Sequence, residues 1–287
     1  MRLVTLARTS FLVGLIGADI QASRAPAMHE HEGAELGLNF VYKLIDLEVL
    51  GLGVDALADL LTSTERLEFN GLNITHPCKQ AVIPLLSDLS DDARSIGAVN
   101  TVVLRDGKRV GHNTDWSGFA ESFRRGLPDV TLRRVVQLGA GGAGSAVAYA
   151  ALKLGVEQLS VFDVAVDRAQ QLAARLNTQF GEGRAVAEQN LESAVAGADG
   201  VIHATPTGMA NYPGLPLPEQ LLQPQMWVCE IVYFPLETEL LRTAKALGCR
   251  ILDGSGMAVF QAAKAFELFT GIGPDARRMW RHFKSVE

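Results

Sequence analysis

The order of apolar and polar positions divides the chain into two successive series of strands and helices. In the first hundred residues, short apolar runs typical of buried strands occupy 11–16, 40–45 and 69–75. Amphipathic stretches that favour helices follow these runs, at 26–38, 54–67 and 79–87. This alternation predicts an N-terminal βα-layered domain, in which helices cover a sheet.

Residues 100–115 interrupt the alternation. Asp106 and Gly107 stand between two runs of alternating apolar residues, which predicts a tight hairpin. An amphipathic helix is then expected over 115–127. Turn-forming residues close this helix and suit a domain boundary, namely Gly126, Pro128 and Asp129.

A second alternation begins after this turn. Strand-like runs start at Val135, Leu159, Asp199, Trp227 and Cys249. A final helical pattern over 257–271 carries an apolar stripe that needs a partner surface. The sequence contains no internal repeat and no low-complexity linker. The predicted fold class is therefore α/β, with a doubly wound parallel sheet in the C-terminal part.

Composition and charge narrow the choice of partner. The 287 residues are 48% hydrophobic, which is typical of a globular chain with a sizeable core. The net charge is −6 and basic residues are interspersed with acidic ones, so we expect no nucleic-acid partner and favour a small polar molecule.

Cysteine and histidine spacing favours neither a disulfide framework nor a metal. Cys78, Cys229 and Cys249 show no metal-ligand or redox spacing, which suits free thiols in a reducing compartment. His29 and His31 are two residues apart and would point to different faces of a helix. We therefore expect no metal and a cytoplasmic location.

The first eighteen residues are superficially similar to a secretory signal, because two arginines precede an apolar run. The same run suits a buried first strand, and the charged Asp19 and Arg24 follow it at once. No segment approaches the roughly 18 apolar residues that a membrane helix needs. We expect no membrane partner.

Three glycines indicate a dinucleotide site. Gly139, Gly141 and Gly144 have G-x-G-x-x-G spacing directly after an apolar strand and at the start of an alanine-rich helix. In this context the loop, with Ala140, Gly142 and Ala143, would place a pyrophosphate among free N–H groups at the helix N-terminus. A glycine-rich turn without a ligand is the plainer alternative.

Asp163 stands 19 residues after Gly144, at the end of the second strand of this series. A carboxylate there accepts from the ribose hydroxyls of NAD and repels the 2′-phosphate of NADP. Alternatively, Asp163 only caps the following turn. Arg168 lies close by and could receive a phosphate.

The stretch "GLNITHPCKQ" gathers Asn73, Thr75 and Lys79 after a strand. Pro77 suits the first turn of a helix, so Lys79 would lie near the helix N-terminus. An ammonium group is disfavoured there by roughly 0.3 to 1 kcal/mol. Lys79 is therefore solvated, paired with a carboxylate, or activated, and an ordinary exposed lysine is the plain reading.

From "GLIGADIQASRAPAMHE" to "FQAAKAFELFTG" the chain resembles the shikimate dehydrogenase family, most closely its NAD-dependent quinate/shikimate dehydrogenase branch. The motifs occur in order: "SRAPAMH", "NGLNITHPCK", "GAVNTVV", "HNTDWSGF", "LGAGGAG", "HATPTGM", "VYFPLETELL" and "GMAVFQA". The resemblance implies a substrate domain over 1–115, a Rossmann domain over 116–255, and last helices, 256–287, that pack on the first domain. It also implies a polyol-acid substrate of aromatic biosynthesis or quinate catabolism. The sequence leaves the oligomeric state open, with a homodimer as one candidate.

The resemblance gives Lys79 the role of acid/base and Asp115 that of its partner. A lysine suits this chemistry because hydride transfer from a secondary alcohol requires removal of the hydroxyl proton. A helix N-terminus and burial disfavour the ammonium form of Lys79, whereas the Asp115 carboxylate favours it, and the sequence leaves this balance open. Asp115 could equally cap the helix that follows.

The resemblance also implies two sets of binding residues. Around the polyol it places Ser23, Asn73, Thr75, Asn100, Tyr233 and Gln261. Around the nucleotide and the nicotinamide it places Thr205, Met209, Val232, Gly254 and Met257. Taken singly, the polar residues could be turn, cap or helix positions, and the methionines could be core residues.

Four positions depart from the family pattern. Ala25 replaces a hydroxyl residue that would hold the substrate carboxylate, and Ala22 replaces a frequent histidine. His203 stands for the asparagine of N-A-T-P, and Glu230 stands for an aspartate. These changes leave the choice between shikimate, quinate and an aminoshikimate-type or other polyol acid open.

At the end of the second strand of the C-terminal series, NADP-using relatives read N-R-T-x-x-R, whereas this chain has Asp163, Val164 and Ala165, and only the last arginine, Arg168, remains. The sequence therefore favours NAD over NADP. A non-catalytic NAD-sensing protein is the rival from another class, and the presence of both Lys79 and Asp115 counts against it.

Overall fold

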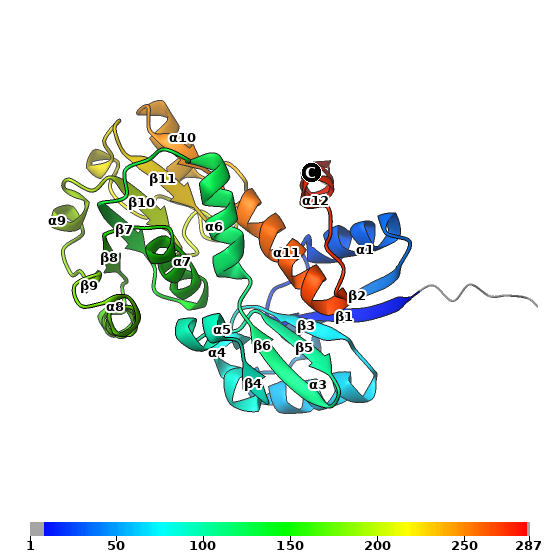
Figure 1. The fold of residues 1–287 in the computed structure, drawn as a ribbon. Coiled ribbons are helices and arrows are strands. Elements are labelled where there is room, and N and C mark those ends of the chain that lie inside the picture. Colours follow the sequence, from blue (N-terminus) through cyan, green and yellow to red (C-terminus); the bar gives the residue numbers. More distant parts are fainter. Residues whose placement is uncertain (1–8, 286–287) are drawn as a thin grey trace, which may run out of the picture. The chain divides into compact units, whose positions relative to one another are not determined.

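The computed structural model describes residues 9–285 and divides into two compact units (Figure 1). The first unit contains the chain up to residue 94, residues 98–114, and the chain from residue 262. The second contains residues 95–97 and 115–261. Both units are α/β, as the alternation of the sequence predicts. The turn at Gly126, Pro128 and Asp129 falls inside the second unit.

The first unit is built on a six-stranded mixed sheet of order β2-β1-β3-β5-β6-β4. Strand β1 pairs in parallel with β2 and β3, whereas β5 runs antiparallel to both β3 and β6. The strands are β1 (Ser10–Gly17), β2 (Asn39–Asp46), β3 (Gly71–Ile74), β4 (Asp88–Leu89), β5 (Thr101–Arg105) and β6 (Lys108–His112).

The predicted hairpin joins β5 to β6. Asp106 has φ 52° and Gly107 has φ 70°, so both central residues adopt the left-handed conformation that a two-residue type I′ turn requires. The Asp-Gly pair supplies that conformation at low cost, which confirms the prediction.

The helices of the first unit are α1 (Ala25–Glu35), α2 (Leu47–Leu50), α3 (Leu57–Arg66), α4 (Cys78–Ala81), α5 (Asp91–Ile96) and α12 (Ala276–Ser285), and α11 (Ser255–Thr270) ends in this unit.

The segment 79–87 departs from the single helix that the sequence predicts there. Instead of one helix over 79–87, α4 has four residues and a 3₁₀ turn covers Ile83–Leu85. Pro84 explains the break, because it lacks an N–H and disfavours helical geometry at the residue before it.

An aromatic cluster and an ion pair join the C-terminal helices to the rest of the first unit. Phe266 of α11 stacks on Phe40 of β2, with ring centroids 5.1 Å apart. The fully buried Glu32 of α1 accepts two hydrogen bonds from the Arg278 guanidinium of α12, at 2.7 and 2.6 Å. Removing the arginine would leave the buried carboxylate of Glu32 without its opposite charge, which would strongly destabilise the folded protein.

The second unit has an all-parallel sheet of order β9-β8-β7-β10-β11-β12. This is the 3-2-1-4-5-6 order of the doubly wound fold, and its topological switch point lies between β7 and β10. The strands are β7 (Arg134–Leu138), β8 (Gln158–Phe162), β9 (Ala185–Ala187), β10 (Gly200–His203), β11 (Trp227–Glu230) and β12 (Arg250–Leu252).

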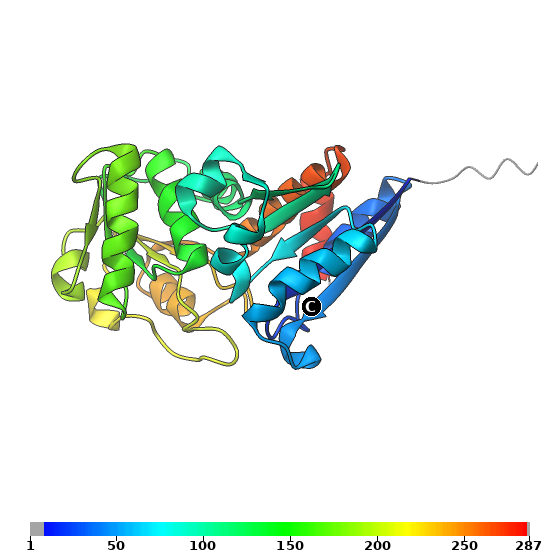
Figure 2. The same ribbon diagram turned by 90° about the horizontal axis from the view of Figure 1, so that it is seen from below.

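Five helices and a 3₁₀ turn at Glu219–Leu221 accompany this sheet, which Figure 2 shows from a second side. The helices are α6 (Asp115–Gly126), α7 (Gly142–Lys153), α8 (Val166–Phe180), α9 (Leu191–Val195) and α10 (Glu239–Ala246), and α11 begins in this unit. In a doubly wound sheet, ligands bind outside the carboxyl ends of the strands at the switch point. The loops after β7, β8 and β10 are therefore where a nucleotide is expected.

Several further expectations concern the chain as a whole. The signal-like residues 1–8 lie outside the described part, whereas the apolar run that follows them forms β1. No helix among residues 9–285 combines the length and apolarity needed to cross a membrane. Within the same range no cluster of three or more metal-ligating side chains is present, and the three cysteines are unpaired and buried.

His29 gives the first unit a predicted pH dependence. Its ring is fully buried between Phe40, Tyr42, Phe266 and Phe269, and neither ring nitrogen has a hydrogen-bond partner among the described residues. Burial lowers the pKa of His29 from 6.5 to about 3. In the folded protein the imidazole therefore stays neutral in a pH range where the unfolded chain binds a proton.

Because the folded pKa of His29 is depressed, this term of stability is fully present above pH 6.5 and is lost as the pH falls toward 3. We expect His29→Met to remove the term, so that the free energy of unfolding of the original chain falls by roughly 1 kcal/mol more per pH unit than that of the variant below about pH 6. Urea unfolding between about pH 7 and 5 measures this difference. His76→Gln, at an exposed histidine, is the control. Parallel curves for the original chain and His29→Met would contradict the prediction.

Candidate active site

The end of β3 carries a buried amide whose polar atoms are paired inside the first unit. Asn73 is 7% exposed, and its Oδ1 accepts a hydrogen bond of 2.8 Å from the hydroxyl of Tyr42. Its Nδ2 donates to the carbonyl oxygen of Asn100 at 3.2 Å and to Oγ1 of Thr101 at 3.1 Å. These bonds fix the side chain of Asn73 and join β3 to the adjacent strand β5 and, across β1, to β2.

A second buried amide continues this network. Nδ2 of Asn100 donates to Oγ1 of Thr114 at 2.9 Å, and Oδ1 of Asn100 accepts from the backbone N–H of Thr114 at 2.7 Å. The hydroxyl of Thr101 donates to the same Oδ1 at 3.0 Å. Thr114 directly precedes Asp115 in the chain, so Asn100 holds the backbone at the residue before the predicted partner of Lys79.

Lys79 lies on the short helix α4 and is half-buried. Its carbonyl oxygen accepts a hydrogen bond of 2.8 Å from the N–H of Val99, the residue before Asn100. The structure thus brings the backbone of Lys79 next to the amide network. A four-residue helix has only a small dipole, so the field that the sequence predicted at Lys79 is weaker than expected.

Ser23 has a local role in the structure. Its half-buried hydroxyl accepts a hydrogen bond of 3.3 Å from the N–H of Ala25, the first residue of α1. Ser23 is not the N-cap that the sequence left open, because Arg24 holds that position without a side-chain cap bond, and the contact is a local turn bond. Thr75, also half-buried, is held by its backbone, because its N–H donates to Ile16 and its carbonyl accepts from Cys78.

Burial decides the chemistry of the cysteine beside Lys79. Cys78 is fully buried, and burial raises the pKa of its thiol. A thiol in that state is a poor nucleophile, because the reactive form is the thiolate. Apart from this thiol, the titratable side chains of the loop are Lys79 and the exposed His76.

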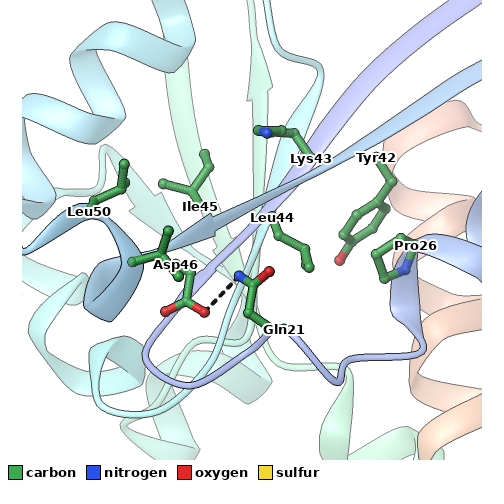
Figure 3. Close-up of a pocket in the computed structure, with 9 residues that line it drawn as sticks. Gln21, Pro26, Tyr42, Lys43, Leu44, Ile45, Asp46 and Leu50 are labelled. Atoms are coloured by element: carbon green, nitrogen blue, oxygen red, sulfur yellow. Dashed lines mark hydrogen bonds between the residues drawn. The ribbon is translucent and has the colours of Figure 1, made fainter.

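A pocket of about 450 Å³ opens beside the edge strand β2 (Figure 3). Tyr42 and Pro26 line it on one side, and Gln21 donates to the buried carboxylate of Asp46 at 2.8 Å on the other. The predicted substrate residues lie outside this lining, but Tyr42 joins the pocket to Asn73, and Gln21 and Pro26 flank the segment of Ser23 and Ala25. Tyr42 had no motif of its own, and sequence reasoning missed it.

Three of the predicted substrate residues belong to the second unit. Asp115 is the first residue of α6 and is 6% exposed, so its carboxylate lies at the positive end of a twelve-residue helix. Gln261 of α11 is half-buried and donates to the carbonyl of Ala258 at 3.1 Å. Tyr233 follows β11 and is 37% exposed.

The glycine loop after β7 has the close backbone approaches of a dinucleotide site. Gly139 has φ +102°, and a Cβ there would lie 2.4 Å from the carbonyl oxygen of Ala204. A Cβ at Gly144 would lie 2.4 Å from the carbonyl oxygen of Gly139. At Gly141, by contrast, a Cβ meets no atom within 4 Å. The loop is therefore tightly packed on the protein side and open at Gly141.

Two side chains hold this loop in place. Nε2 of Gln137 donates to the carbonyl oxygens of Gly139 and Gly144, both at 2.8 Å. The carboxylate of Asp163 accepts from the N–H groups of Ala140 and Ala165, at 2.7 and 2.8 Å. The sequence prediction missed Gln137, although a polar residue inside the apolar run of β7 was an available signal. The structure shows that this residue is fully buried, where a polar group needs a partner.

Asp163 therefore has the turn role that the sequence gave as its alternative. That role is compatible with a ribose contact, because each carboxylate oxygen has a second lone pair. The side chain is half-buried at the end of β8, and Val164 beside it is 96% exposed. Arg168 is exposed in the first turn of α8.

The other predicted cofactor residues lie at the carboxyl ends of the neighbouring strands. Thr205 and Met209 follow β10, Val232 follows β11, and Met257 is in the first turn of α11. A Cβ at Gly254 would lie 2.6 Å from the carbonyl oxygens of Ile231 and Val232, so only glycine fits there. Met257 is buried, whereas Met209 is 40% exposed.

The residues present fit a nicotinamide dinucleotide. The first N–H groups of α7 have no partner within the helix, and they face a loop whose open point is Gly141. Gly139 to Gly144 would hold the pyrophosphate and Asp163 the ribose.

Comparisons with known proteins agree with both halves of the site. Residues 15–102 match the model of the shikimate dehydrogenase substrate binding domain, residues 122–225 that of the alanine dehydrogenase/PNT C-terminal domain, and residues 254–282 that of the shikimate 5′-dehydrogenase C-terminal domain. A protein of Streptomyces avermitilis named shikimate dehydrogenase (NADP(+)) is 58% identical over 96% of this chain and 95% of its own.

Two relatives from Corynebacterium carry the other cofactor in their names. The quinate/shikimate dehydrogenase (NAD(+)) of Corynebacterium efficiens is 50% identical over 96% of this chain and 99% of its own. The solved quinate dehydrogenase from Corynebacterium glutamicum in complex with NAD has a TM-score of 0.91 at 48% identity, covering 97% of this chain and 100% of that one.

Gly141 and Gly144 form a matched pair for testing the dinucleotide site. We expect Gly141→Ala to keep the melting temperature, because its Cβ meets no protein atom, and to raise the Kd for NADH about tenfold or more, because it blocks the approach of the pyrophosphate. Gly144→Ala collides with Gly139 and should lower the melting temperature as well. Fluorescence titration and thermal unfolding measure the two effects. Unchanged NADH affinity in Gly141→Ala would place the pyrophosphate elsewhere.

Proposed function

The chain belongs to the shikimate dehydrogenase family, whose members are oxidoreductases that act on CH–OH groups, and we propose that it interconverts shikimate or quinate with the 3-dehydro acid, using NAD. The observation that supports this best is the buried Asn73–Asn100 network at the end of β3, which adjoins the backbone of Lys79 through the N–H of Val99. We infer that the lysine serves proton transfer near these fixed hydrogen-bonding groups, which suit a polyol.

The proposed mechanism assigns the proton to Lys79 and the hydride to the cofactor. A bound nicotinamide supplies the hydride acceptor or donor. In the oxidative direction, the neutral amine of Lys79 takes the proton of the substrate hydroxyl while the hydride leaves the same carbon. In the reverse direction, the ammonium of Lys79 returns the proton to the oxygen. Asp115 orients the lysine and binds a substrate hydroxyl.

The amide network favours the polyol indirectly. Because Tyr42, Asn100 and Thr101 already engage Asn73, its amide cannot rotate freely, and the groups at the end of β3 keep one arrangement. Fixed polar groups lose little conformational freedom when a substrate binds. They also reject a substrate that lacks the matching hydroxyl, since a buried polar group without a partner costs about 1 to 3 kcal/mol.

The cofactor preference rests on the end of β8. Asp163 would repel a 2′-phosphate, and the neighbouring Val164 and Ala165 offer no basic group to receive one. Relatives named for NAD are 49–50% identical to this chain, whereas relatives named for NADP reach 58%. The local residues at β8 are the reason for proposing NAD.

A specialised polyol acid is the second candidate substrate, and Ala25 favours it. Ala25 offers only its backbone N–H, which is bonded to Ser23. A substrate that depends less on a carboxylate contact, such as an amine-bearing shikimate analogue, would lose less binding free energy at Ala25.

The alternative from another class is a redox sensor that binds NAD without turnover. Such a protein has no use for Lys79 and Asp115 together.

We expect Lys79→Met to lower kcat by about 10²-fold or more, with a smaller change in NADH affinity, because the variant removes the proton-transfer group and leaves the dinucleotide loop intact. Steady-state rates and NADH titration separate the two. Lys108→Met, at an exposed lysine of β6, is the control and should keep the original kcat. A kcat close to that of the original chain would remove Lys79 from the mechanism.

We expect Asp163→Ser to change cofactor selectivity. The original chain should use NAD at least about tenfold more efficiently than NADP, and the variant should lose most of this ratio, because the like charge opposite the 2′-phosphate is gone. The ratio of kcat/KM values is the correct readout, since loosening of the loop lowers both values together. An unaltered ratio would mean that Arg168 or another residue sets the preference.

Ala25→Ser and Ala25→Thr should restore the absent hydroxyl donor. If the substrate is shikimate or quinate, we expect its KM to fall about tenfold with little change in kcat, since the carboxylate is remote from the reacting carbon. Ala34→Ser, at an exposed position near the other end of α1, is the control. No tightening in either variant would favour the specialised substrate.

A further inference from the structure

A buried ionisable pair occupies the ends of β10 and β11. His203 and Glu230 are register partners on these adjacent parallel strands and are 0% and 2% exposed. Nδ1 of His203 lies 2.9 and 3.0 Å from the two carboxylate oxygens of Glu230. Because a carboxylate only accepts, Nδ1 carries the proton and donates it. Nε2 is therefore the ring nitrogen that faces away from Glu230.

Each member of the pair also bonds the loop after a strand. Nε2 of His203 contacts Oγ1 of Thr205 at 2.5 Å. Glu230 accepts a hydrogen bond of 2.9 Å from the N–H of Val232 and another of 3.0 Å from the hydroxyl of Thr238. The pair therefore links the β10 loop to the β11 loop, and these loops carry three of the proposed cofactor residues, Thr205, Met209 and Val232.

The shape of the imidazole suits this link. Its two nitrogens lie on opposite sides of the ring, so one side chain bonds a carboxylate on β11 and a hydroxyl on its own loop at the same time. The asparagine usual at this position in the family is shorter, and the aspartate usual on β11 is shorter as well. Both departures of this chain thus lie at directly paired positions.

We propose that His203 and Glu230 are a coupled pair of positioning residues, which hold the Thr205 hydroxyl and the Val232 backbone in place for the bound cofactor. This inference rests on the proposed function. In the neutral imidazole, Nε2 accepts the Thr205 proton. Thr207 N–H occupies one lone pair of Oγ1 at 3.3 Å, and the remaining lone pair is left to accept from an O–H or N–H of the cofactor.

A double-mutant cycle between His203 and Thr205 tests the link, with NADH as the probe and Kd from fluorescence titration as the readout. We expect His203→Asn to raise Kd about fivefold or more in the original chain, but less than about twofold when Thr205→Val is already present. The KM for the polyol acid at saturating cofactor should stay within about twofold. An equal effect in both backgrounds, or no effect of His203→Asn, would overturn the proposal.

A second cycle tests the coupling of the pair. Glu230→Asp alone withdraws the carboxylate from His203 and Val232 and should weaken NADH binding, and adding His203→Asn to it should raise Kd by a smaller factor than His203→Asn does in the original chain. Losses that multiply in the double variant would contradict the proposed coupling. Should His203→Asn fail to fold, as judged by circular dichroism, His203→Gln replaces it in the cycle.

Asn177→Ala separates positioning from general stability. Asn177 of α8 exchanges two hydrogen bonds of 2.8 Å with the backbone of Ala185 on β9, away from β10 and β11. It should lower the melting temperature and leave the Kd for NADH within about twofold. If it weakens NADH binding as much as His203→Asn does, the effect at His203 is one of stability and the proposal fails.

The cycle also distinguishes this inference from the proposed function. If the original chain binds NADH but turns over neither shikimate nor quinate, the proposed substrate is wrong. The double-mutant cycle would still test the positioning role, because its readout is the Kd for NADH. An original chain that does not bind NADH would overturn both the proposed cofactor and the positioning role.

Discussion

The hydrogen bonding of two buried asparagines, Asn73 and Asn100, is the interaction on which the arrangement around the end of β3 depends. Such groups are stable in an apolar interior only when their donors and acceptors are paired. Their partners come from β2, β5 and the residue before α6, so satisfying two side chains fixes three segments that are distant in the sequence. Val99 extends the constraint to the backbone of Lys79. A requirement of burial thus also fixes the backbone of the residue that we propose for proton transfer.

The nucleotide side depends on backbone approach in the same way. Gly139 and Gly144 leave no room for a side chain, and Gln137 and Asp163 occupy the polar groups that this packing would otherwise leave unpaired. Gly141, by contrast, has open space where a Cβ would lie. The loop is therefore tightly packed at Gly139 and Gly144 and open at Gly141, where a pyrophosphate would approach. His203 and Glu230 extend this organisation to the next two strands.

Local signals in the sequence predicted most of the fold. Period, turn chemistry and glycine spacing located the strands, the Asp106-Gly107 hairpin and the dinucleotide loop. The helix expected over 79–87 was wrong, because its apolar pattern outweighed Pro84 in the prediction. Short elements such as β4 and β9 carried too few residues to show a period. The partners of Asn73, Gln137 and His203 depend on which strands lie side by side, and that information is not local. The roles of the site residues remain predictions.

Initial rates with shikimate and with quinate, each with NAD and with NADP, test the central claim most directly. The account predicts turnover of at least one acid with NAD, abolished or strongly reduced in Lys79→Met, and slower turnover with NADP. Absence of turnover in all four combinations, with NADH binding intact, would contradict it. In that case the amide network and Lys79 would serve a different substrate, and the structure of the site would have to be explained by that compound.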